Sequence, residues 1–230
     1  MPRSMPASMA KTPEDALEDD VVDIWCADTG CRREGVAGLL SSEEIARSER
    51  FRRAEDRDRW IHARAILRLL LARYTAIAAP AIRLRAGPYG KPELDQGPRD
   101  LRFSLSHAGR IAVYGFARGS EIGVDVEMAG RPIDPLGIAA RALGAEVRDE
   151  LERLDPPGRE RAFLRRWVRH EAVLKCRGTG FAGAAAPASR GPSPWVVELD
   201  IGVSGAFAAL AVEAGPRRLR PRSWAIPGES

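Results

Sequence analysis

The stretch Ile122-Gly-Val-Asp-Val-Glu127 decides how the rest of the chain is interpreted. Its aliphatic residues alternate with Gly123, Asp125 and Glu127, and this period of two predicts a strand with both carboxylates on one face. Residues spaced i, i+2 on a strand lie about 6.5 Å apart at Cα, so their side chains can converge on one cation. Hard oxygen ligands favour Mg²⁺ or Mn²⁺ over zinc. The alternative is a half-solvated strand with an acidic wet face.

A second segment, Trp167-Val-Arg-His-Glu-Ala-Val-Leu-Lys175, has the period of an amphipathic helix. The apolar arc of that helix is formed by Phe163, Trp167 and Leu174. Glu171 and Lys175 lie on the rim of this arc, one turn apart, where an ordinary i, i+4 surface pair is the alternative interpretation. The helix ends at Arg177-Gly-Thr-Gly180, a glycine-rich turn beside cations, which is typical of an anion site.

Composition excludes several classes of protein. The 230 residues carry 36 Lys and Arg against 32 Asp and Glu, and 44% of them are hydrophobic, which is enough for a sizeable core. The longest apolar runs are far shorter than the roughly 20 residues of a membrane span. Three cysteines, Cys26, Cys31 and Cys176, have no metal-ligand spacing and indicate a reducing compartment. We therefore expect a soluble, cytoplasmic protein.

The order of predicted elements indicates two similar halves. Residues 1–20 are polar and read as a disordered tail. Residues 21–120 read as strand, long helix and hairpin, and residues 121–230 as strand, helix and strands, with a mobile loop at Phe181 to Pro194. The expected fold is α+β, built from two pseudo-symmetric α/β halves with the active site between them, where ligand clefts tend to form. Two fused halves predict a monomer.

The first half contributes cations. A capping signal at Ser41 opens a helical region that runs to Tyr74, and its polar side, which includes Arg47, Arg59 and Arg68, is expected to be solvated. Arg64 lies at the edge of the apolar stripe, where a shielded guanidinium can bind a phosphate bidentately.

Two further segments of the first half carry polar groups. Gly87-Pro-Tyr-Gly-Lys-Pro92 predicts a rigid loop whose amides and ammonium suit a nucleotide, although this segment alone favours a plain turn with a surface lysine. Leu101 to His107 alternates as a strand and pairs in a hairpin with Ile111 to Ala117.

These blocks, taken in order, resemble the signatures of the Sfp-type 4′-phosphopantetheinyl transferases. The matching blocks are Phe103-Ser-Leu-Ser-His107, Ile122-Gly-Val-Asp-Val-Glu127 and Trp167-Val-Arg-His-Glu-Ala-Val-Leu-Lys175, with Tyr89-Gly-Lys-Pro92 and Ala63-Arg-Ala-Ile-Leu-Arg68 upstream. Several blocks in the family order form a specific signal that covers roughly Val21 to Val212.

The resemblance implies Mg²⁺-dependent transfer of the 4′-phosphopantetheine arm of coenzyme A to a serine of an apo carrier protein, with release of adenosine 3′,5′-bisphosphate. Asp125, Glu127 and Glu171 correspond to the metal-binding acids of the family, with Mg²⁺, or alternatively Mn²⁺, as the ion. Glu171, or water bound to it, corresponds to the base for the serine hydroxyl. Lys175 corresponds to the cation at the diphosphate.

The resemblance also implies a set of coenzyme-binding residues. His107 and the neighbouring Ser106 correspond to contacts with coenzyme A phosphate, and Tyr89, Gly90, Lys91 and Pro92 border the adenine. Arg47 corresponds to a basic position for the 3′-phosphate, with Arg59 and Arg64 as further candidates. The implied partners are coenzyme A and an acidic acyl or peptidyl carrier, of fatty-acid, polyketide or nonribosomal-peptide type.

Two positions depart from the family pattern, since His170 replaces a usual lysine and Ala108 replaces a frequent small hydroxyl residue. Neither change removes a metal ligand or Lys175. Two other classes stay open: a non-catalytic carrier- or nucleotide-binding module on the same fold, and a nucleic-acid binder that uses the basic helices. The latter lacks any recognition motif, and only 6% of residues are aromatic.

Overall fold

The computed structural model describes residues 16–30, 35–87, 89–179 and 192–224. Most of the predicted tail and most of the predicted loop at Phe181 to Pro194 lie outside these ranges. Leu17, which belongs to the predicted tail 1–20, is buried in the first core, and its carbonyl accepts a hydrogen bond from Arg118. The last residues of the predicted tail are therefore part of the fold.

The described elements follow one another in runs of helices and runs of strands. The helices are α1 (Ser42–Ser48), α2 (Ala54–Thr75), α3 (Pro135–Ala142), α4 (Ala145–Glu152) and α5 (Pro156–Arg177), with short 3-10 turns η2 (Val36–Leu39) and η3 (Ala79–Ala81). The strands are β1 (Val21–Asp28), β2 (Leu84–Ala86), β3 (Pro92–Leu94), β4 (Leu101–Ala108), β5 (Ile111–Arg118), β6 (Ile122–Met128), β7 (Trp195–Leu199), β8 (Ala206–Val212) and β9 (Arg218–Ser223).

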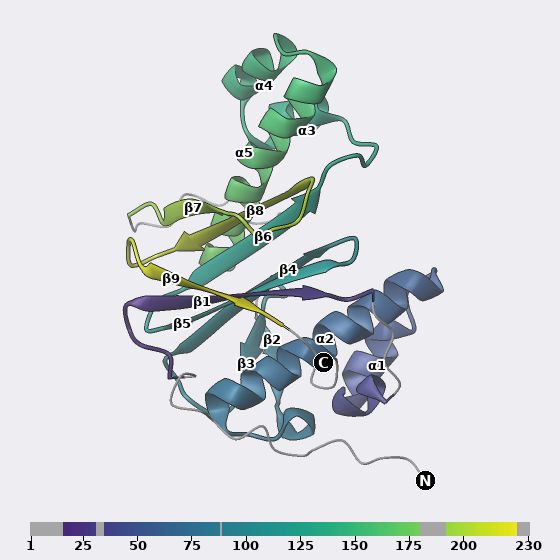
Figure 1. Ribbon diagram of the computed structural model, residues 1–230, viewed down its shortest axis with the longest axis vertical. Coiled ribbons are helices and arrows are strands. Elements are labelled where there is room, and N and C mark those ends of the chain that lie inside the picture. The colour runs from purple at the N-terminus through teal and green to yellow at the C-terminus, as the bar shows by residue number, and fades with distance from the viewer. Residues whose placement is uncertain (1–15, 31–34, 88, 180–191, 225–230) are drawn as a thin grey trace.

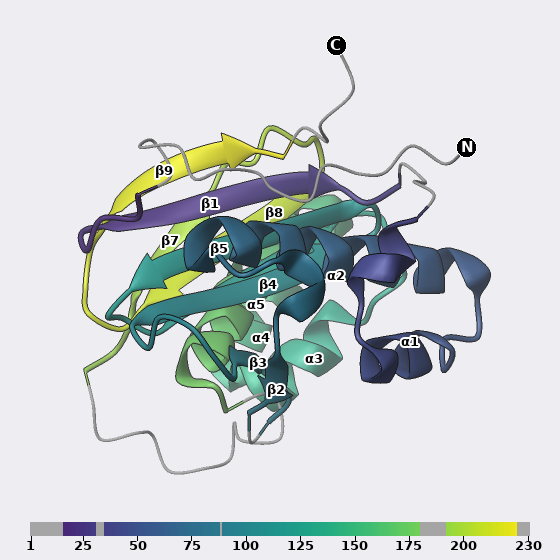
Figure 2. The ribbon, with the colours of Figure 1, turned by 90° about the horizontal axis from the view of Figure 1, so that it is seen from below.

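Two sheets lie between the two long helices. The first has the strand order β4-β5-β1-β9 and the second has the order β6-β8-β7, while β2 and β3 form a separate hairpin. Figure 1 shows both sheets in the middle of the molecule, with α5, α3 and α4 at the top and α1 and α2 at the bottom. Seen from below in Figure 2, α2 crosses the first sheet. The prediction of an α+β fold is confirmed.

Three apolar layers hold these elements together. The α2 side of the first sheet buries one core that includes Leu67, Leu70 and Phe116. Between the two sheets, aliphatic residues from both halves, such as Ile24 and Val124, form a second core. Small residues of α5 pack on the far side of the second sheet. Because the middle core is shared, each half covers an apolar face of the other.

The predicted helical region from Ser41 to Tyr74 is divided into α1 and α2. The capping box at Ser41 is present as predicted, with the Glu44 side chain bonded back to the Ser41 amide. The chain leaves the helix at residues 49–53 because this arginine-rich segment offers no apolar face to bury, apart from the half-exposed Phe51.

The C-terminal strand crosses the predicted boundary between the halves. β9 pairs with β1 in parallel, from Val21 opposite Arg218 to Cys26 opposite Ser223. Buried Asp23 on β1 accepts a hydrogen bond from Arg220 of β9 and another from Tyr74 of α2. The arginine-rich strand β9 is thus an edge strand of the first sheet, and the boundary at residue 120 stays a prediction.

Candidate active site

The alternation predicted for β6 holds in the structure. Ile122, Val124 and Val126 point into the core between the sheets and are buried. Asp125 and Glu127 lie on the opposite face, as the period of a strand requires. The Asp125 side chain is 5% exposed and that of Glu127 is 27% exposed, so the two carboxylates stand at different depths of one site.

Gly123 allows α5 to approach this face of β6 at backbone distance. A Cβ atom added at Gly123 would lie 2.1 Å from the carbonyl oxygen of Ala172 and 2.3 Å from the amide nitrogen of Cys176. Any side chain would push the helix away. Because Glu171 and Lys175 directly precede these two contact residues, the missing side chain is what brings them to the acids of β6.

Two serines of β4 attach the first half to β6. Ser104 Oγ accepts a hydrogen bond from the Val124 amide at 3.1 Å, and Ser106 Oγ donates to Asp125 Oδ1 at 2.8 Å. Both serines are buried. Their side chains supply the hydrogen bonds that link β4 of the first sheet to β6 of the second, because a buried amide or carboxylate needs a partner. The sequence predicted Ser106 as a phosphate contact, and it also positions Asp125.

Lys175 reaches the same carboxylate from α5. Its Nζ lies 2.6 Å from Asp125 Oδ1 and 2.8 Å from Ser106 Oγ. The serine therefore accepts from the ammonium and donates to the carboxylate. Strand β4, strand β6 and helix α5 meet in this three-residue contact, which lies at the floor of a cavity between the halves.

This central cavity has a volume of about 560 Å³ and collects nearly all the predicted site residues. Its lining includes Arg47, Arg64, Tyr89, Gly90, Lys91, Pro92, Ser106, His107, Asp125, Glu127, Glu171 and Lys175. Arg59 does not line it: its guanidinium pairs with Glu55 and Asp56 on its own helix, at 3.3 and 3.5 Å.

The acids of the cavity have the electrostatics of an anionic site. Burial raises the pKa of Glu127 and of Glu171, and the neighbouring charge of Asp125 raises both further. Asp125 Oδ2 and Glu171 Oε1 are buried and have no hydrogen-bond partner. A divalent cation would satisfy both oxygens and remove the repulsion, so the donor set fits a hard metal ion.

The acids are not gathered around a point in the arrangement observed. Within the four described ranges, no three His, Cys, Asp or Glu side chains are grouped closely enough to hold a metal ion. Lys175 takes the place of a cation at Asp125. For the three acids to share one metal ion, the Lys175 ammonium would have to move away from Asp125, or the side chains of Glu127 and Glu171 would have to rotate toward Asp125.

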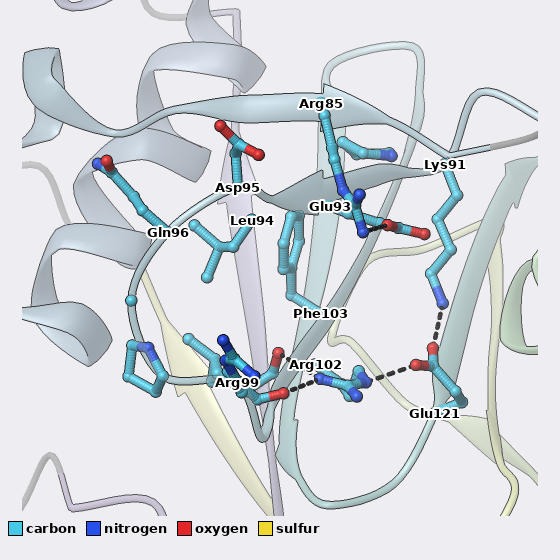
Figure 3. A pocket seen from close by; sticks show the side chains of 14 residues that line it. Arg85, Lys91, Glu93, Leu94, Asp95, Gln96, Arg99, Arg102, Phe103 and Glu121 are labelled. Atoms are coloured by element: carbon cyan, nitrogen blue, oxygen red, sulfur yellow. Dashed lines mark hydrogen bonds and ion pairs between the residues drawn. The ribbon is translucent and has the colours of Figure 1, made fainter.

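The cations differ in how available they are. Arg64 lies 2.6 Å from Glu44 Oε1, and its side chain is 14% exposed. Arg47 has no carboxylate partner among the described residues, and its guanidinium lies 5.8 Å from the centre of the Trp60 ring. The Lys91 ammonium points toward Glu121, as Figure 3 shows, and Glu121 is not among the residues that line the central cavity. Arg47 and Lys175 are thus the cations best placed to meet an anion.

His107 lies beside this charge cluster, near Lys175 and Asp125. Burial lowers its pKa, and the nearby Lys175 ammonium lowers it further. A bound phosphate would oppose both effects, so His107 can gain a proton when an anion enters.

Sequence reasoning missed two structural roles. Arg68, predicted on a solvated face, is buried: it donates to Glu44 Oε2 at 2.7 Å and to the carbonyls of Ala79 and Ile82. Trp60 lines the cavity, and the guanidinium carbons of Arg47 and Arg64 each lie 5.8 Å from the centre of its ring. Arg64, one helical turn after Trp60, was the available signal for one of these contacts, whereas Arg47 lies on α1.

Comparison with known proteins identifies the class to which this fold and cavity belong. Residues 121–195 match the 4′-phosphopantetheinyl transferase superfamily, and residues 31–117 match the N-terminal region of 4′-phosphopantetheinyl transferases. The second match covers the arginines of α1 and α2, and the first covers Asp125, Glu127, Glu171 and Lys175.

Individual relatives agree with the family profiles. The chain is 30% identical to the 4′-phosphopantetheinyl transferase HetI of Nostoc sp. over 179 residues, which are 76% of each protein. It is 37% identical to a candidate 4′-phosphopantetheinyl transferase of Synechocystis sp. over 150 residues, 65% of this chain and 61% of that protein. It is 34% identical to AcpT of Salmonella typhi over 62% of this chain and 68% of AcpT. The chain belongs to the 4′-phosphopantetheinyl transferase family, as its sequence blocks predicted.

Proposed function

We propose that the chain transfers the 4′-phosphopantetheine arm of coenzyme A to a serine of an apo carrier protein and releases adenosine 3′,5′-bisphosphate. The observation that carries this proposal is the meeting of Asp125, Glu127, Glu171 and Lys175, from two separate segments, in one cavity with Ser106 and His107. Together with family membership, this favours a catalytic role over a binding module.

The reaction is a displacement at phosphorus. The serine oxygen forms a bond to the phosphorus that bears the pantetheine, and the bond from that phosphorus to the oxygen of the adenosine bisphosphate breaks. The serine proton must leave as the new bond forms. Glu171 is our candidate to receive it, because it is a half-buried carboxylate with a raised pKa at the edge of the cavity.

Negative charge accumulates on the leaving phosphate. Lys175 is our candidate to stabilise it, since its ammonium already lies at the floor of the cavity. Asp125, Glu127 and Glu171 would hold Mg²⁺, which neutralises charge on the diphosphate when it is bound. His107 and Arg47 would bind coenzyme phosphates, the first as a hydrogen-bond donor and the second as a fixed charge.

We further propose a cytoplasmic monomer that serves an acidic carrier. Cys26 and Cys176 are free thiols, in agreement with a reducing compartment. In the described parts of the chain, no helix is both long and apolar enough to cross a bilayer.

The proposal is tested by intact-mass analysis of an apo carrier incubated with coenzyme A and Mg²⁺. We expect the wild-type protein to add one phosphopantetheine to the carrier. Lys175→Ala and Glu127→Gln should each slow this by roughly 10²-fold or more, the scale for losing one charge-stabilising group. Glu198→Gln, on the exposed surface of β7, is the matched control and should react at the wild-type rate.

Two results would point to the other classes. Coenzyme A binding by wild-type protein without any mass gain on acyl or peptidyl carriers would favour the non-catalytic module. Salt-sensitive binding of DNA or RNA that coenzyme A does not compete would favour the nucleic-acid binder.

A further inference from the structure

A second cavity lies next to the central one, on the other side of the loop that precedes β3. It has a volume of about 690 Å³ and lies between the β2–β3 hairpin, the 95–99 segment and β4 (Figure 3). Lys91 and Pro92 line both cavities. The loop from Tyr89 to Pro92 is therefore a wall with one side toward the central cavity and one toward this hairpin cavity.

Glu121 holds the Lys91 side chain on the hairpin side of the wall. Lys91 Nζ donates to Glu121 Oε2 at 2.9 Å and to the carbonyl oxygen of Ile122 at 3.0 Å, and the lysine side chain is only 15% exposed. The other carboxylate oxygen of Glu121 accepts from Arg102 on β4. Figure 3 shows Glu121 between the two cations. Two of the three ammonium donors are thus occupied by protein.

The backbone of Glu121, whose side chain holds Lys91, is itself fixed by hydrogen bonds. The Glu121 carbonyl accepts hydrogen bonds from the Glu213 amide at 3.0 Å and from the Cys176 thiol at 3.2 Å. Glu121 directly precedes β6 and lies four residues before Asp125. An ion bridge to Glu121 therefore fixes the loop relative to the strand that carries the acids.

We infer that Glu121 is a positioning residue for coenzyme binding. It clamps Lys91 against β6, and this keeps Tyr89 and Gly90 at the border of the central cavity. On this view the Lys91 ammonium does not contact the coenzyme. The inference rests on the proposed function, because it assigns the central cavity to coenzyme A. It also revises the expected role of Lys91, whose ammonium the pattern of the Gly87–Pro92 loop suited to a nucleotide.

The alternative role for Lys91, that of a phosphate ligand, predicts the opposite change in coenzyme A affinity when Glu121 is removed. If Lys91 were a phosphate ligand held in reserve, removal of Glu121 would release an ammonium toward the central cavity and tighten coenzyme binding. If Glu121 is a clamp, its removal loosens the wall and weakens binding. Glu121→Gln thus separates the two roles by direction, which does not depend on the size of the effect.

The test is coenzyme A binding measured by titration calorimetry, without carrier or turnover. We expect Glu121→Gln and Lys91→Met each to weaken binding about tenfold, the scale for breaking one shielded charged pair. The double variant should bind no more weakly than either single variant, because both remove the same clamp. Glu93→Gln, which breaks the Arg85 pair across the same hairpin cavity, is the matched control and should bind like wild type.

Three further readouts separate positioning from loss of fold or loss of charge. Turnover at saturating coenzyme A should stay within about twofold of wild type in Glu121→Gln, since the reacting groups are untouched. The salt dependence of binding should be unchanged in Lys91→Met, because no phosphate contact is lost. Glu121→Asp keeps the charge and should recover part of the affinity.

The inference is overturned if Glu121→Gln binds coenzyme A as tightly as wild type or more tightly, or if the two substitutions are additive. It is also overturned if the wild-type protein does not bind coenzyme A. A wild-type protein that binds coenzyme A but modifies no carrier contradicts the proposed function alone, and the binding pattern of the variants then still decides the role of Glu121.

Discussion

The Lys175 ammonium forms an ion pair with Asp125 that is 2.6 Å long and shares Ser106 as a common hydrogen-bond partner. One residue comes from α5 and the other from β6, so the pair fixes the helix that carries Glu171 against the strand that carries Glu127. A charged pair of this kind, with one partner 5% exposed, is much less screened than a surface ion pair. The floor of the cavity is therefore held together by the same groups that we propose to act on the diphosphate.

Substitution of the two serines of β4 should have different effects, one mainly on stability and the other mainly on turnover. Ser104→Ala leaves the buried Val124 amide without its partner and should lower the free energy of unfolding by about 1–3 kcal/mol. Ser106→Ala leaves Asp125 paired with Lys175 but removes the group that orients both, and turnover should fall about tenfold at saturating coenzyme A. Chemical denaturation and intact-mass rates measure the two effects. Equal loss of stability and of turnover in both variants would contradict this division.

The raised pKa values of Glu127 and Glu171 predict how pH and metal act together. A carboxyl group whose folded pKa lies above its ordinary value of 4.5 stabilises the fold below that pH, and this contribution is lost as the pH rises through the raised value. The metal-free protein should therefore lose stability from about pH 4.5 upward. Mg²⁺ binds only the deprotonated acids, so its stabilising effect should grow over the same range.

Thermal unfolding at several pH values, with and without Mg²⁺, measures this coupling. Mg²⁺ at about 100 times its dissociation constant should add about 2.7 kcal/mol at neutral pH, and much less near pH 4.5. Glu171→Gln should raise the melting temperature of the metal-free protein at neutral pH and abolish the Mg²⁺ effect. The Glu198→Gln variant should keep it. A Mg²⁺ effect that is independent of pH would show that these carboxyl groups do not bind the ion.

The sequence predicted the elements better than their connections. The alternation in β6 and the apolar arc of α5 identified both segments that carry the acids, because period and burial are properties of single elements. Contacts between elements were not readable. Nothing in the spacing of Glu44 and Arg68 shows that they pair in the interior, and nothing in Lys91 shows that Glu121, thirty residues later, draws its ammonium out of the central cavity.

The C-terminal strand illustrates the same limit. The pattern of Arg218–Ser223 is that of an exposed basic edge, and β9 is indeed an edge strand. Its partner is β1, at the other end of the chain, and the pairing depends on Asp23, which is buried beneath it. Because one buried carboxylate, Asp23, helps to select β9 as the partner of β1, the pairing leaves no periodic signal in the sequence of either strand.

Gly123 should be intolerant of any side chain. Gly123→Ala places a methyl group 2.1 Å from the Ala172 carbonyl oxygen, so α5 must shift or the strand must bend. We expect the free energy of unfolding to fall by about 3 kcal/mol, the upper range for overpacking, and the carrier reaction to be lost because Glu171 and Lys175 move with the helix. Gly38→Ala is the matched control, since no heavy atom lies within 4 Å of its added Cβ. A Gly123→Ala protein with wild-type stability would contradict the close contact of α5 with β6.

Trp60 should affect coenzyme binding through Arg47, whose guanidinium lies over its ring. Its ring lies 5.8 Å from the guanidinium carbon of Arg47 and at the same distance from that of Arg64, while Arg64 is already paired with Glu44. Arg47 is thus the free charge of this group, and the ring limits the directions in which it can point. Loss of Arg47 should remove an anion contact, and loss of Trp60 should only weaken it.

The two effects are measurable as coenzyme A affinity, with dephospho-coenzyme A as the comparison. Arg47→Ala should raise the KM for coenzyme A about tenfold and leave that for dephospho-coenzyme A nearly unchanged, if Arg47 binds the 3′-phosphate. Trp60→Leu should shift the same ratio by about two- to fivefold, the range of a partly exposed cation–π contact. Arg57→Ala, on the same helix as Trp60 and outside the cavity, controls for the loss of one positive charge. An equal rise in KM for both coenzymes in Arg47→Ala would place the contact at the diphosphate, and no rise for either would remove Arg47 from the site.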